Sequence, residues 1–218
     1  NTNEEFVHLI KEQLPEVSVD NILAEPIHRN TAPSMAWANH RISMINPNAC
    51  VIATPSDQAI FNEEAFRENV LKGLAFVAEN DRFLTMGVKP TRPEPGYGYI
   101  QMGDVFCDNM YQVQSFTEKP ERDFAKIFVE SGEFYWNTGL FLSNVKHLRE
   151  CFCKILPPVL RDYDKQYPEF SIETENAYMK ESFSSYPNIS VDFGILEKPS
   201  DVCVMKCDFG WADLGTWH

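Results

Sequence analysis

The stretch CVIATPSD, at positions 50–57, carries the pattern on which the predicted fold depends. Its first part, Cys50 to Thr54, is apolar at successive positions, which is typical of a central strand buried on both faces of a parallel sheet. The turn that follows ends at Asp57, and in open α/β sheets ligands bind beyond the carboxyl ends of the strands. We therefore expect Asp57 to face a ligand crevice, where its carboxylate suits a hard cation such as Mg²⁺. The alternative is that Asp57 caps the helix after it.

Helical and strand patterns alternate on both sides of this stretch. Helices are expected at 4–14, 31–45, 63–79, 121–131, 145–153 and 172–182. Strands are expected at 21–24, 50–54, 83–87, 98–103, 110–117, 134–143 and 202–207. On the helix at 31–45, four residues are predicted to form the packed face: Met35, Ala38, Ile42 and Ile45. This order predicts an α/β fold in which helices flank a mixed, mostly parallel sheet.

The composition is that of an ordinary globular domain with an acidic surface. The chain has 218 residues, 44% of them hydrophobic, and a formal net charge of −13. This charge repels nucleic-acid phosphates and anionic lipids, so neither a nucleic acid nor a membrane is expected as a partner. The six cysteines form no C-x-x-C pair, which favours a reducing cytoplasm. We expect residues 1–218 to form a single domain that is part of a longer protein.

A second aspartate follows another predicted strand. Asp213 lies in GWADLG, positions 210–215, where the flanking glycines permit turns that other residues resist. Trp211 and Trp217 are expected to hold this turn in place. Together, Asp57 and Asp213 would form a two-carboxylate cation site at one edge of the sheet. The alternative is a tight turn whose aspartate bonds its own backbone.

Glu118 and Lys119 end a predicted strand at Pro120. Neighbours on a regular strand point to opposite faces, so both side chains reach one ligand only if the chain curls before the proline. In such a curl the carboxylate would accept sugar hydroxyls and the ammonium would meet a phosphate. The alternative is an exposed strand end followed by a helix cap.

Three other polar turns are candidates for ligand contact. Gly98 follows Tyr97, and glycine on a strand often marks close approach by a ligand, with a bulge as the alternative. Asn137 offers an amide that both donates and accepts hydrogen bonds. The segment Arg29 to Thr31 opens a helix, whose N-terminal amides suit an anion or a base carbonyl, with ordinary capping as the alternative. The histidines on predicted helices, including His40, are interpreted as surface or packed residues.

Taken in order, these segments resemble the mannose-1-phosphate guanylyltransferases, also called GDP-mannose pyrophosphorylases. The matching stretches are NILAEP (21–26), RNTAP (29–33), PSD (55–57), PTRP (90–93), GYGY (96–99), FTEKP (116–120), WNTGLF (136–141), SVD (190–192), EK (197–198) and WADLGTW (211–217). Each stretch is short, but they follow one another in the right order over nearly the whole chain.

The resemblance implies a Rossmann-like sugar nucleotidyltransferase fold that joins GTP to mannose 1-phosphate, with Mg²⁺ held by Asp57 and Asp213. The residues that it places on the guanosine side are Glu25, Arg29, Asn30 and Thr31. Those that it places at the mannose are Tyr97, Gly98, Glu118 and Asn137. It assigns Lys119 to the sugar phosphate.

The chain departs from the pattern of this family at two points. The glycine-rich signature that grips the triphosphate would precede the first residue and is absent, so we expect these 218 residues alone to release no pyrophosphate. The histidine that usually follows the Pro-x-Asp turn is Gln58 here.

Other functions compete with this one. The same fold could act on another base or sugar 1-phosphate, or a non-catalytic homologue could bind a nucleotide sugar. A glycosyltransferase of related fold is not expected, because it would need an Asp-x-Asp metal motif, and we expect none in these 218 residues. A homo-oligomer is compatible with each of these functions.

Overall fold

The computed structural model describes residues 1–196 and 201–215, and its contacts group into two compact units. Unit 1 contains residues 1–49 and 148–194, and unit 2 contains residues 50–147 and 195–218. The α/β class and the mixed sheet are confirmed. The prediction of one nucleotidyltransferase domain over residues 1–218 stays a prediction.

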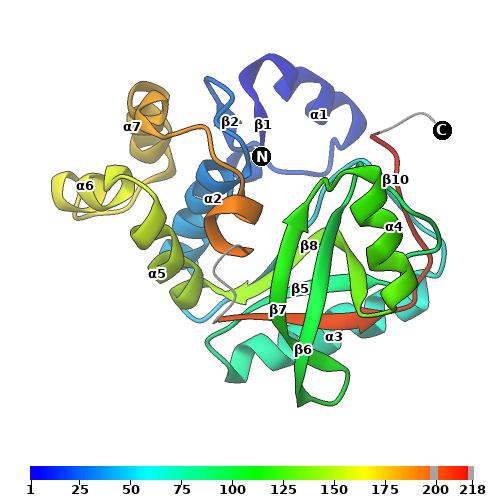
Figure 1. Cartoon of the computed structure of the whole chain (residues 1–218). Helices are drawn as coiled ribbons and strands as arrows, with labels where there is room; N and C mark the ends of the chain where they lie inside the picture. Colours follow the sequence, from blue (N-terminus) through cyan, green and yellow to red (C-terminus); the bar gives the residue numbers. More distant parts are fainter. Residues whose placement is uncertain (197–200, 216–218) are drawn as a thin grey trace. The chain divides into compact units, whose positions relative to one another are not determined.

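The sheet of unit 2 joins six strands in the order β3-β8-β5-β9-β7-β6. Figure 1 shows β5, β6, β7 and β8 of this sheet. In that order their bounds are Cys50–Ala53, Phe134–Asn144, Phe83–Val88, Val202–Cys207, Met110–Glu118 and Gly98–Cys107. β8 is the longest of them: its first residues pair with β6 and its last residues pair with β3. The middle strands β5 and β9 are almost fully buried, which places the core of unit 2 around them.

Within the described residues, β5 and β9 form the only parallel pair of this sheet, so the prediction of a mostly parallel sheet is wrong. β3 and β5 do run in the same direction, as the strand-helix-strand rhythm predicts. However, β8 lies between them and runs the opposite way. A strand that comes later in the chain can enter between two consecutive strands, and hydrophobic periodicity carries no information about that.

β3 also lies elsewhere than predicted. The apolar run at its centre predicts a central strand buried on both faces, but β3 is at one end of the strand order and is half-buried along its length. It pairs antiparallel with β8, with Val51 opposite Ser143. An apolar run of this length reports a tendency to be buried and does not specify the neighbours of the strand.

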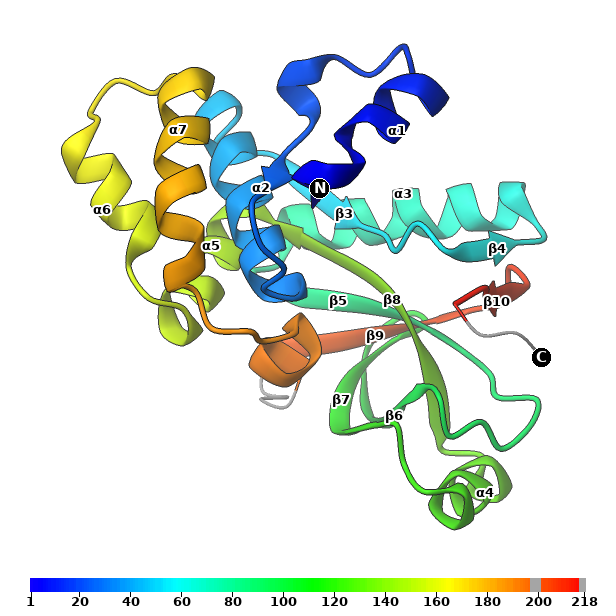
Figure 2. The ribbon, with the colours of Figure 1, turned by 90° about the horizontal axis from the view of Figure 1, so that it is seen from above.

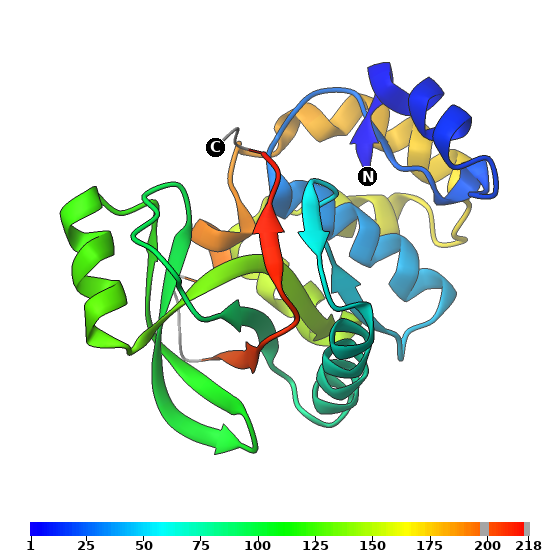
Figure 3. The same ribbon diagram turned by 90° about the vertical axis from the view of Figure 1, so that its right-hand side faces the viewer.

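Two short strands adjoin the predicted metal ligands Asp57 and Asp213, and the sequence pattern does not predict either strand. They are β4 (Gln58–Ile60) and β10 (Trp211–Asp213), which pair antiparallel (Figure 3, β10 in red beside β4 in cyan). Three residues are too few to show a period of two, so only the pairing identifies them as strands.

Two helices of unit 2 lie where the sequence predicts them, α3 at Glu63–Glu79 and α4 at Arg122–Ser131. α3 lies along the sheet (Figure 2) and comes close to it at Gly73, where a Cβ would be 2.9 Å from Leu142 Cδ2. The cap of α3 is Asn62, whose Oδ1 accepts a hydrogen bond from the Ala65 amide at 3.1 Å. The alternative that Asp57 caps this helix is therefore wrong.

Unit 1 is mainly helical, with one short parallel pair of strands, β1 (Thr2–Asn3) and β2 (Ala24–Glu25). The helices of unit 1 and of its junctions with unit 2 are α1 (Val7–Gln13), α2 (Thr31–Ile45), α5 (Val145–Ile155), α6 (Val159–Gln166) and α7 (Ile172–Ser182). Short helical turns cover Glu4–Phe6, Val19–Asn21, Phe183–Ser185 and Asp192–Leu196. Every predicted helix is found; α6 is additional, and the strand expected at 21–24 is reduced to Ala24–Glu25.

The buried face of α2 is not the predicted one. Ile45 is 67% exposed, whereas Trp37, His40 and Arg41 are each at most 3% exposed. The buried face of a helix depends on the residues that pack against it. In unit 1 the residues that pack against α2 include carboxylates.

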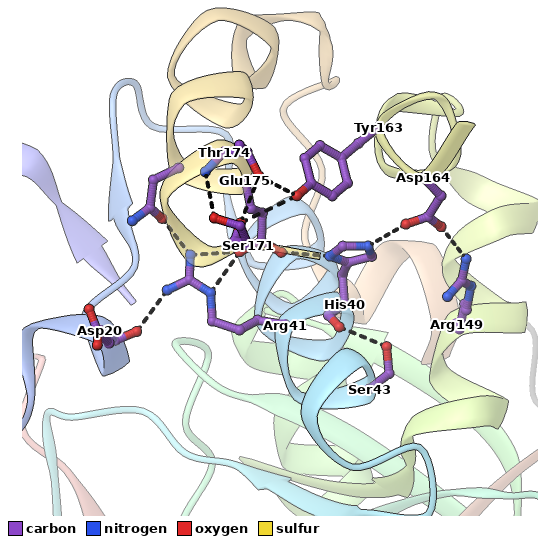
Figure 4. A network of polar contacts seen from close by, with 11 residues as sticks. Asp20, His40, Arg41, Ser43, Arg149, Tyr163, Asp164, Ser171, Thr174 and Glu175 are labelled. Atoms are coloured by element: carbon purple, nitrogen blue, oxygen red, sulfur yellow. Dashed lines mark hydrogen bonds and ion pairs between the residues drawn. The ribbon is translucent and has the colours of Figure 1, made fainter. Parts of the chain in front are cut away.

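These carboxylates and the cations of α2 form a buried ionic network (Figure 4). Glu175 is fully buried and accepts hydrogen bonds from His40 Nδ1 and Arg41 Nε, both at 2.6 Å. His40 Nε2 donates to Asp164 Oδ1 at 2.8 Å, and Arg149 Nη2 bonds the other oxygen of Asp164 at 2.6 Å. Because ionised carboxylates only accept, both ring nitrogens of His40 carry a proton. The network therefore ties α2 to α6 and α7 through a histidine cation.

The charge of His40 makes the stability of unit 1 depend on pH. Burial alone would lower the pKa of His40, but hydrogen bonds and charges from Glu175 and Asp164 outweigh burial and raise the pKa above its ordinary value of 6.5. A raised pKa means that the stabilisation is complete below about pH 6.5 and is lost as the pH rises through the folded-state pKa. The rings of Tyr163 and Phe170 also lie edge-on to the His40 ring, and Arg41 is its neighbour on α2.

We expect His40→Gln to lower the urea midpoint of unfolding most at about pH 6 and least at about pH 9. The measurement is the midpoint of both proteins across this range. An advantage of the wild type that stays constant with pH would show that His40 is held as a neutral ring.

Candidate active site

The structure brings Asp57 and Asp213 together in unit 2. The register of β4 and β10 places Asp213 opposite Gln58, and the Leu214 amide donates to the Asp57 carbonyl at 2.8 Å. A Cβ built on Gly215 would lie 3.0 Å from Asp213 Oδ1 and 3.1 Å from Asp57 Oδ2. Two carboxylates more than a hundred positions apart in the sequence thus converge on one small volume, which glycine leaves open.

Asp213 also bonds its own turn, as the alternative interpretation predicts. Its Oδ1 accepts a hydrogen bond from the Gly215 amide at 2.6 Å. A carboxylate has about four acceptor positions on its two oxygens, so this bond orients the group and does not exhaust it. Trp217, the other tryptophan expected to hold the turn, lies outside the described residues, as do Glu197 and Lys198.

Tyr97 lies beside the carboxylates, in a group of aromatic rings. The ring of Tyr97 is 5.1 Å from that of Trp136 and 5.2 Å from that of Trp211. Burial, and then the charge of Asp213, raise the pKa of Tyr97 above its ordinary value, so its hydroxyl keeps its proton. The charge of Arg92 acts against these two effects on the pKa of Tyr97, and its guanidinium lies over the Trp136 ring, 5.5 Å from the centroid. Arg92 is a cation of the site that the predicted site residues do not include, although the PTRP stretch contains it.

Gly98, Glu118 and Asn137 form a row across three strands. Gly98 on β6 is opposite both Glu118 on β7 and Asn137 on β8. A Cβ on Gly98 would be 2.5 Å from Glu118 Oε2, so the Glu118 carboxylate lies over the glycine. Asn137 Oδ1 accepts hydrogen bonds from Thr85 Oγ1 at 3.0 Å and from the Gly139 amide at 3.2 Å, which sets the orientation of its amide.

At Lys119 the chain makes the curl that the sequence gives as the condition for Glu118 and Lys119 to reach one ligand. The φ of Lys119 is +47°, in the left-handed region that residues other than glycine enter rarely. Its amide donates to the Tyr97 carbonyl at 3.2 Å, and its Nζ is 3.7 Å from Glu118 Oε1. Backbone strain of this kind persists where the surroundings impose it, often at functional sites. The Glu118 carboxylate and the Lys119 ammonium thus lie close together. On a regular strand these two side chains would point to opposite faces.

The four residues predicted on the guanosine side belong to unit 1. Glu25 ends β2, is 6% exposed, and accepts a hydrogen bond from Ser34 Oγ. Burial raises the pKa of Glu25. Arg29 donates from Nη2 to the Ser184 carbonyl at 2.9 Å, and its buried Nε has no hydrogen-bond partner among the described residues.

Asn30 and Thr31 open α2. The φ of Asn30 is +66°, and its Oδ1 accepts a hydrogen bond from the Thr31 amide at 2.9 Å, so Asn30 is the helix cap. Thr31 Oγ1 accepts a hydrogen bond from the Val191 amide at 2.9 Å. Ordinary capping, the alternative for this segment, accounts for Asn30 and leaves Thr31 as a contact to the distant SVD stretch.

The expectation that the chain lacks an Asp-x-Asp triplet is wrong, because residues 162–164 form one. The triplet lies on α6, where Tyr163 is buried and Asp164 is bonded to His40 and Arg149, so it is part of the ionic network. Among residues 1–196 and 201–215, no group of three or more His, Cys, Asp or Glu side chains is arranged to hold a metal. Nor does any helix in this part of the chain have the length and apolar character needed to cross a membrane.

The chain is similar to known proteins over almost its whole length. The model of the nucleotidyl transferase family matches residues 2–218. A mannose-1-phosphate guanylyltransferase of Sinorhizobium fredii is 34% identical over 220 residues, and one of Escherichia coli K12 is 33% identical over 226 residues. Each match covers 99% of this chain but 43% and 47% of the respective relative. The chain therefore spans somewhat less than half the length of these relatives.

Solved structures share the fold of this chain over almost its whole length. A mannose-1-phosphate geranyltransferase from Thermus thermophilus superimposes with a TM-score of 0.81 at 26% identity, over 99% of this chain and 60% of its own. A mannose-6-phosphate isomerase from Helicobacter pylori, at 23% identity, shares the fold with a TM-score of 0.74 over 97% of this chain and 82% of its own. Because the model of this family matches residues 2–218, the chain belongs to the nucleotidyl transferase family.

Proposed function

We propose that this chain carries sugar-side and metal-binding residues of an enzyme that transfers GMP from GTP to mannose 1-phosphate, giving GDP-mannose and pyrophosphate. The names of its curated relatives, both mannose-1-phosphate guanylyltransferases, support this substrate pair. The observation that carries the proposal is the convergence of Asp57 and Asp213 on the space beside Gly215. Two carboxylates at one point repel each other, and a divalent cation removes that repulsion.

The donor set fits Mg²⁺. Mg²⁺ prefers oxygen ligands and is usually held by one or two carboxylates together with water and substrate phosphates. Asp57 is exposed and Asp213 is half-buried, so both remain open to a phosphate. When bound, Mg²⁺ would neutralise charge on the phosphates.

The remaining residues of the row suit a sugar phosphate. Glu118 would accept hydrogen bonds from sugar hydroxyls, and Asn137 and the Tyr97 hydroxyl would add neutral polar contacts. Lys119 would meet the phosphate of mannose 1-phosphate. In a chain with a net charge of −13, Lys119 supplies local positive charge beside Glu118, and Arg92 supplies it near Tyr97. We assign the guanosine side to four residues of unit 1: Glu25, Arg29, Asn30 and Thr31.

In the proposed reaction, a phosphate oxygen of mannose 1-phosphate attacks the α-phosphorus of GTP. The new phosphorus–oxygen bond forms as the bond to the pyrophosphate oxygen breaks, and pyrophosphate leaves with the electron pair. A sugar phosphate is largely ionised near neutral pH, so no general base is required. The residues contribute by holding the two phosphates in line and by compensating their charge.

The test is a panel of triphosphates and sugar 1-phosphates offered to the full-length protein, with release of pyrophosphate and formation of nucleotide sugar as the readouts. We expect GTP with mannose 1-phosphate to give the highest kcat/KM. A preference for another base or sugar would show that the protein has a different substrate pair within the same family. Tight binding of GDP-mannose without turnover would favour the non-catalytic alternative.

The space above Gly98 provides a second test on the sugar side. We expect Gly98→Ala to reduce kcat/KM for mannose 1-phosphate by about 10- to 100-fold, because the new Cβ displaces the Glu118 carboxylate. KM for GTP should change little. Gly103→Ala, on the same strand away from Glu118, is the matched control. An equal loss in both variants would mean that strand stability, and not the position of Glu118, is responsible.

A further inference from the structure

The side chain of Gln58 joins the two segments that carry the converging carboxylates. Trp211 Nε1 donates to Gln58 Oε1 at 2.7 Å, and Gln58 Nε2 donates to the Pro55 carbonyl at 3.4 Å. Pro55 begins the turn that ends at Asp57, and Trp211 is on the strand that ends at Asp213. One amide group therefore spans both segments.

Backbone hydrogen bonds also hold these segments together. The ladder of β4 and β10 has three residue pairs. Beyond it the Leu214 amide bonds the Asp57 carbonyl at 2.8 Å, and on the other side the Phe61 and Asn62 amides bond the Gly210 and Phe209 carbonyls at 2.9 Å each. All six residues of this ladder are only half-buried. These bonds align the two backbones, but two carboxylates close together repel each other, so a further bond to the turn of Asp57 strengthens the constraint on their separation.

Trp211 connects this bridge to the core of unit 2. Its ring is 5.2 Å from that of Tyr97 and 6.5 Å from that of Trp136, and both of these side chains are buried. Gln58 accepts its hydrogen bond from a side chain that packing already holds. Its second hydrogen bond then transmits this fixed position to the turn of Asp57.

We propose that Gln58 is a positioning residue that, through Trp211, holds Asp57 at the distance from Asp213 required for a divalent cation. The inference rests on the proposed function, which identifies the two carboxylates as the ligands. It adds a residue that does not touch the cation, and it assigns a role to the indole N–H of Trp211.

The probe is Mn²⁺, whose binding to the full-length protein without substrates is measured by electron paramagnetic resonance. We expect Gln58→Leu to weaken Mn²⁺ binding about tenfold, the size of effect seen when groups supporting a ligand are removed. Trp211→Phe keeps an aromatic ring but loses the N–H, and we expect a similar loss. Because both substitutions break the same bond, the double variant should bind Mn²⁺ no more weakly than either single variant. Gln58→His, which can supply one donor and one acceptor nitrogen, should restore most of the affinity.

Gln101→Leu is the matched control. Gln101 lies on β6 and also makes two side-chain hydrogen bonds, with Glu133 and Ser115. This variant should lose stability to a similar degree and keep its Mn²⁺ affinity. Additive losses in the double variant, or unchanged Mn²⁺ binding in Gln58→Leu, would overturn the role of Gln58.

Asp57→Asn separates this inference from the proposed function. If Asp57→Asn loses Mn²⁺ binding while Gln58→Leu keeps it, only the positioning role fails. If the wild type does not bind Mn²⁺, or if Asp57→Asn binds it normally, the carboxylates are not the ligands, and both proposals fail together.

Discussion

We expect Asp57→Asn to reduce kcat by on the order of 10³-fold at saturating GTP and mannose 1-phosphate. Asparagine keeps the shape of the side chain but removes the negative charge that suits it to Mg²⁺. The lost charge should also move the Mg²⁺ concentration required for half-maximal rate to higher values. The measurement is pyrophosphate release as a function of Mg²⁺ concentration, and chelation of the metal should abolish the activity of the wild type.

A loss of folding would not produce this combination of effects. Without metal, Asp57→Asn removes a like charge beside Asp213, so its thermal stability should equal or exceed that of the wild type. Asp208→Asn, an exposed aspartate in the loop before β10, is the control and should keep both its rate and its Mg²⁺ dependence. A normal Mg²⁺ titration in Asp57→Asn would exclude Asp57 as a ligand.

The largest expected effect on stability is at Glu175. We expect Glu175→Gln to lower the free energy of unfolding by about 3–5 kcal/mol, the range found when one partner of a buried ion pair is removed. Glu175 is fully buried, and without its charge His40 and Arg41 would face an amide whose nitrogen is itself a donor. The measurement is urea unfolding, with hydrogen exchange along α7 to locate the change in unit 1.

Glu173→Gln provides the comparison on the same helix. Glu173 is exposed in the first turn of α7, so its substitution should change the free energy of unfolding by less than about 0.5 kcal/mol. Similar stabilities of the two variants would show that the network is weakly coupled to folding, since well-packed neutral groups can replace some buried ion pairs without loss.

The most accurate predictions concern features that depend on residues close together in the sequence. The helices at 63–79 and 121–131 have caps and apolar positions within one segment, and α3 and α4 match them to within a residue. The curl at Lys119 is a condition that strand geometry sets, because two neighbouring side chains could not otherwise point the same way, and the φ of +47° at Lys119 meets it.

The errors arise where partners come from far along the sequence. β8 enters between β3 and β5, and nothing in either strand indicates that neighbour. The predicted face of α2 is wrong for the same reason: Arg41 is buried because Glu175, 134 positions away, neutralises it. Apolar periodicity records which side chains avoid water and does not show which charges find a counter-charge.

From the residues alone, one can read the α/β class, the helices and the order of the polar turns, because each depends on a short run of neighbouring side chains. Folding in three dimensions decides that Asp57 and Asp213 meet at Gly215, that Gln58 joins their segments, and that His40 is buried as a cation. These contacts join residues more than a hundred positions apart, and their formation depends on the pairing of whole strands and helices. The arrangement of these side chains therefore depends on interactions between distant residues, which no local pattern encodes.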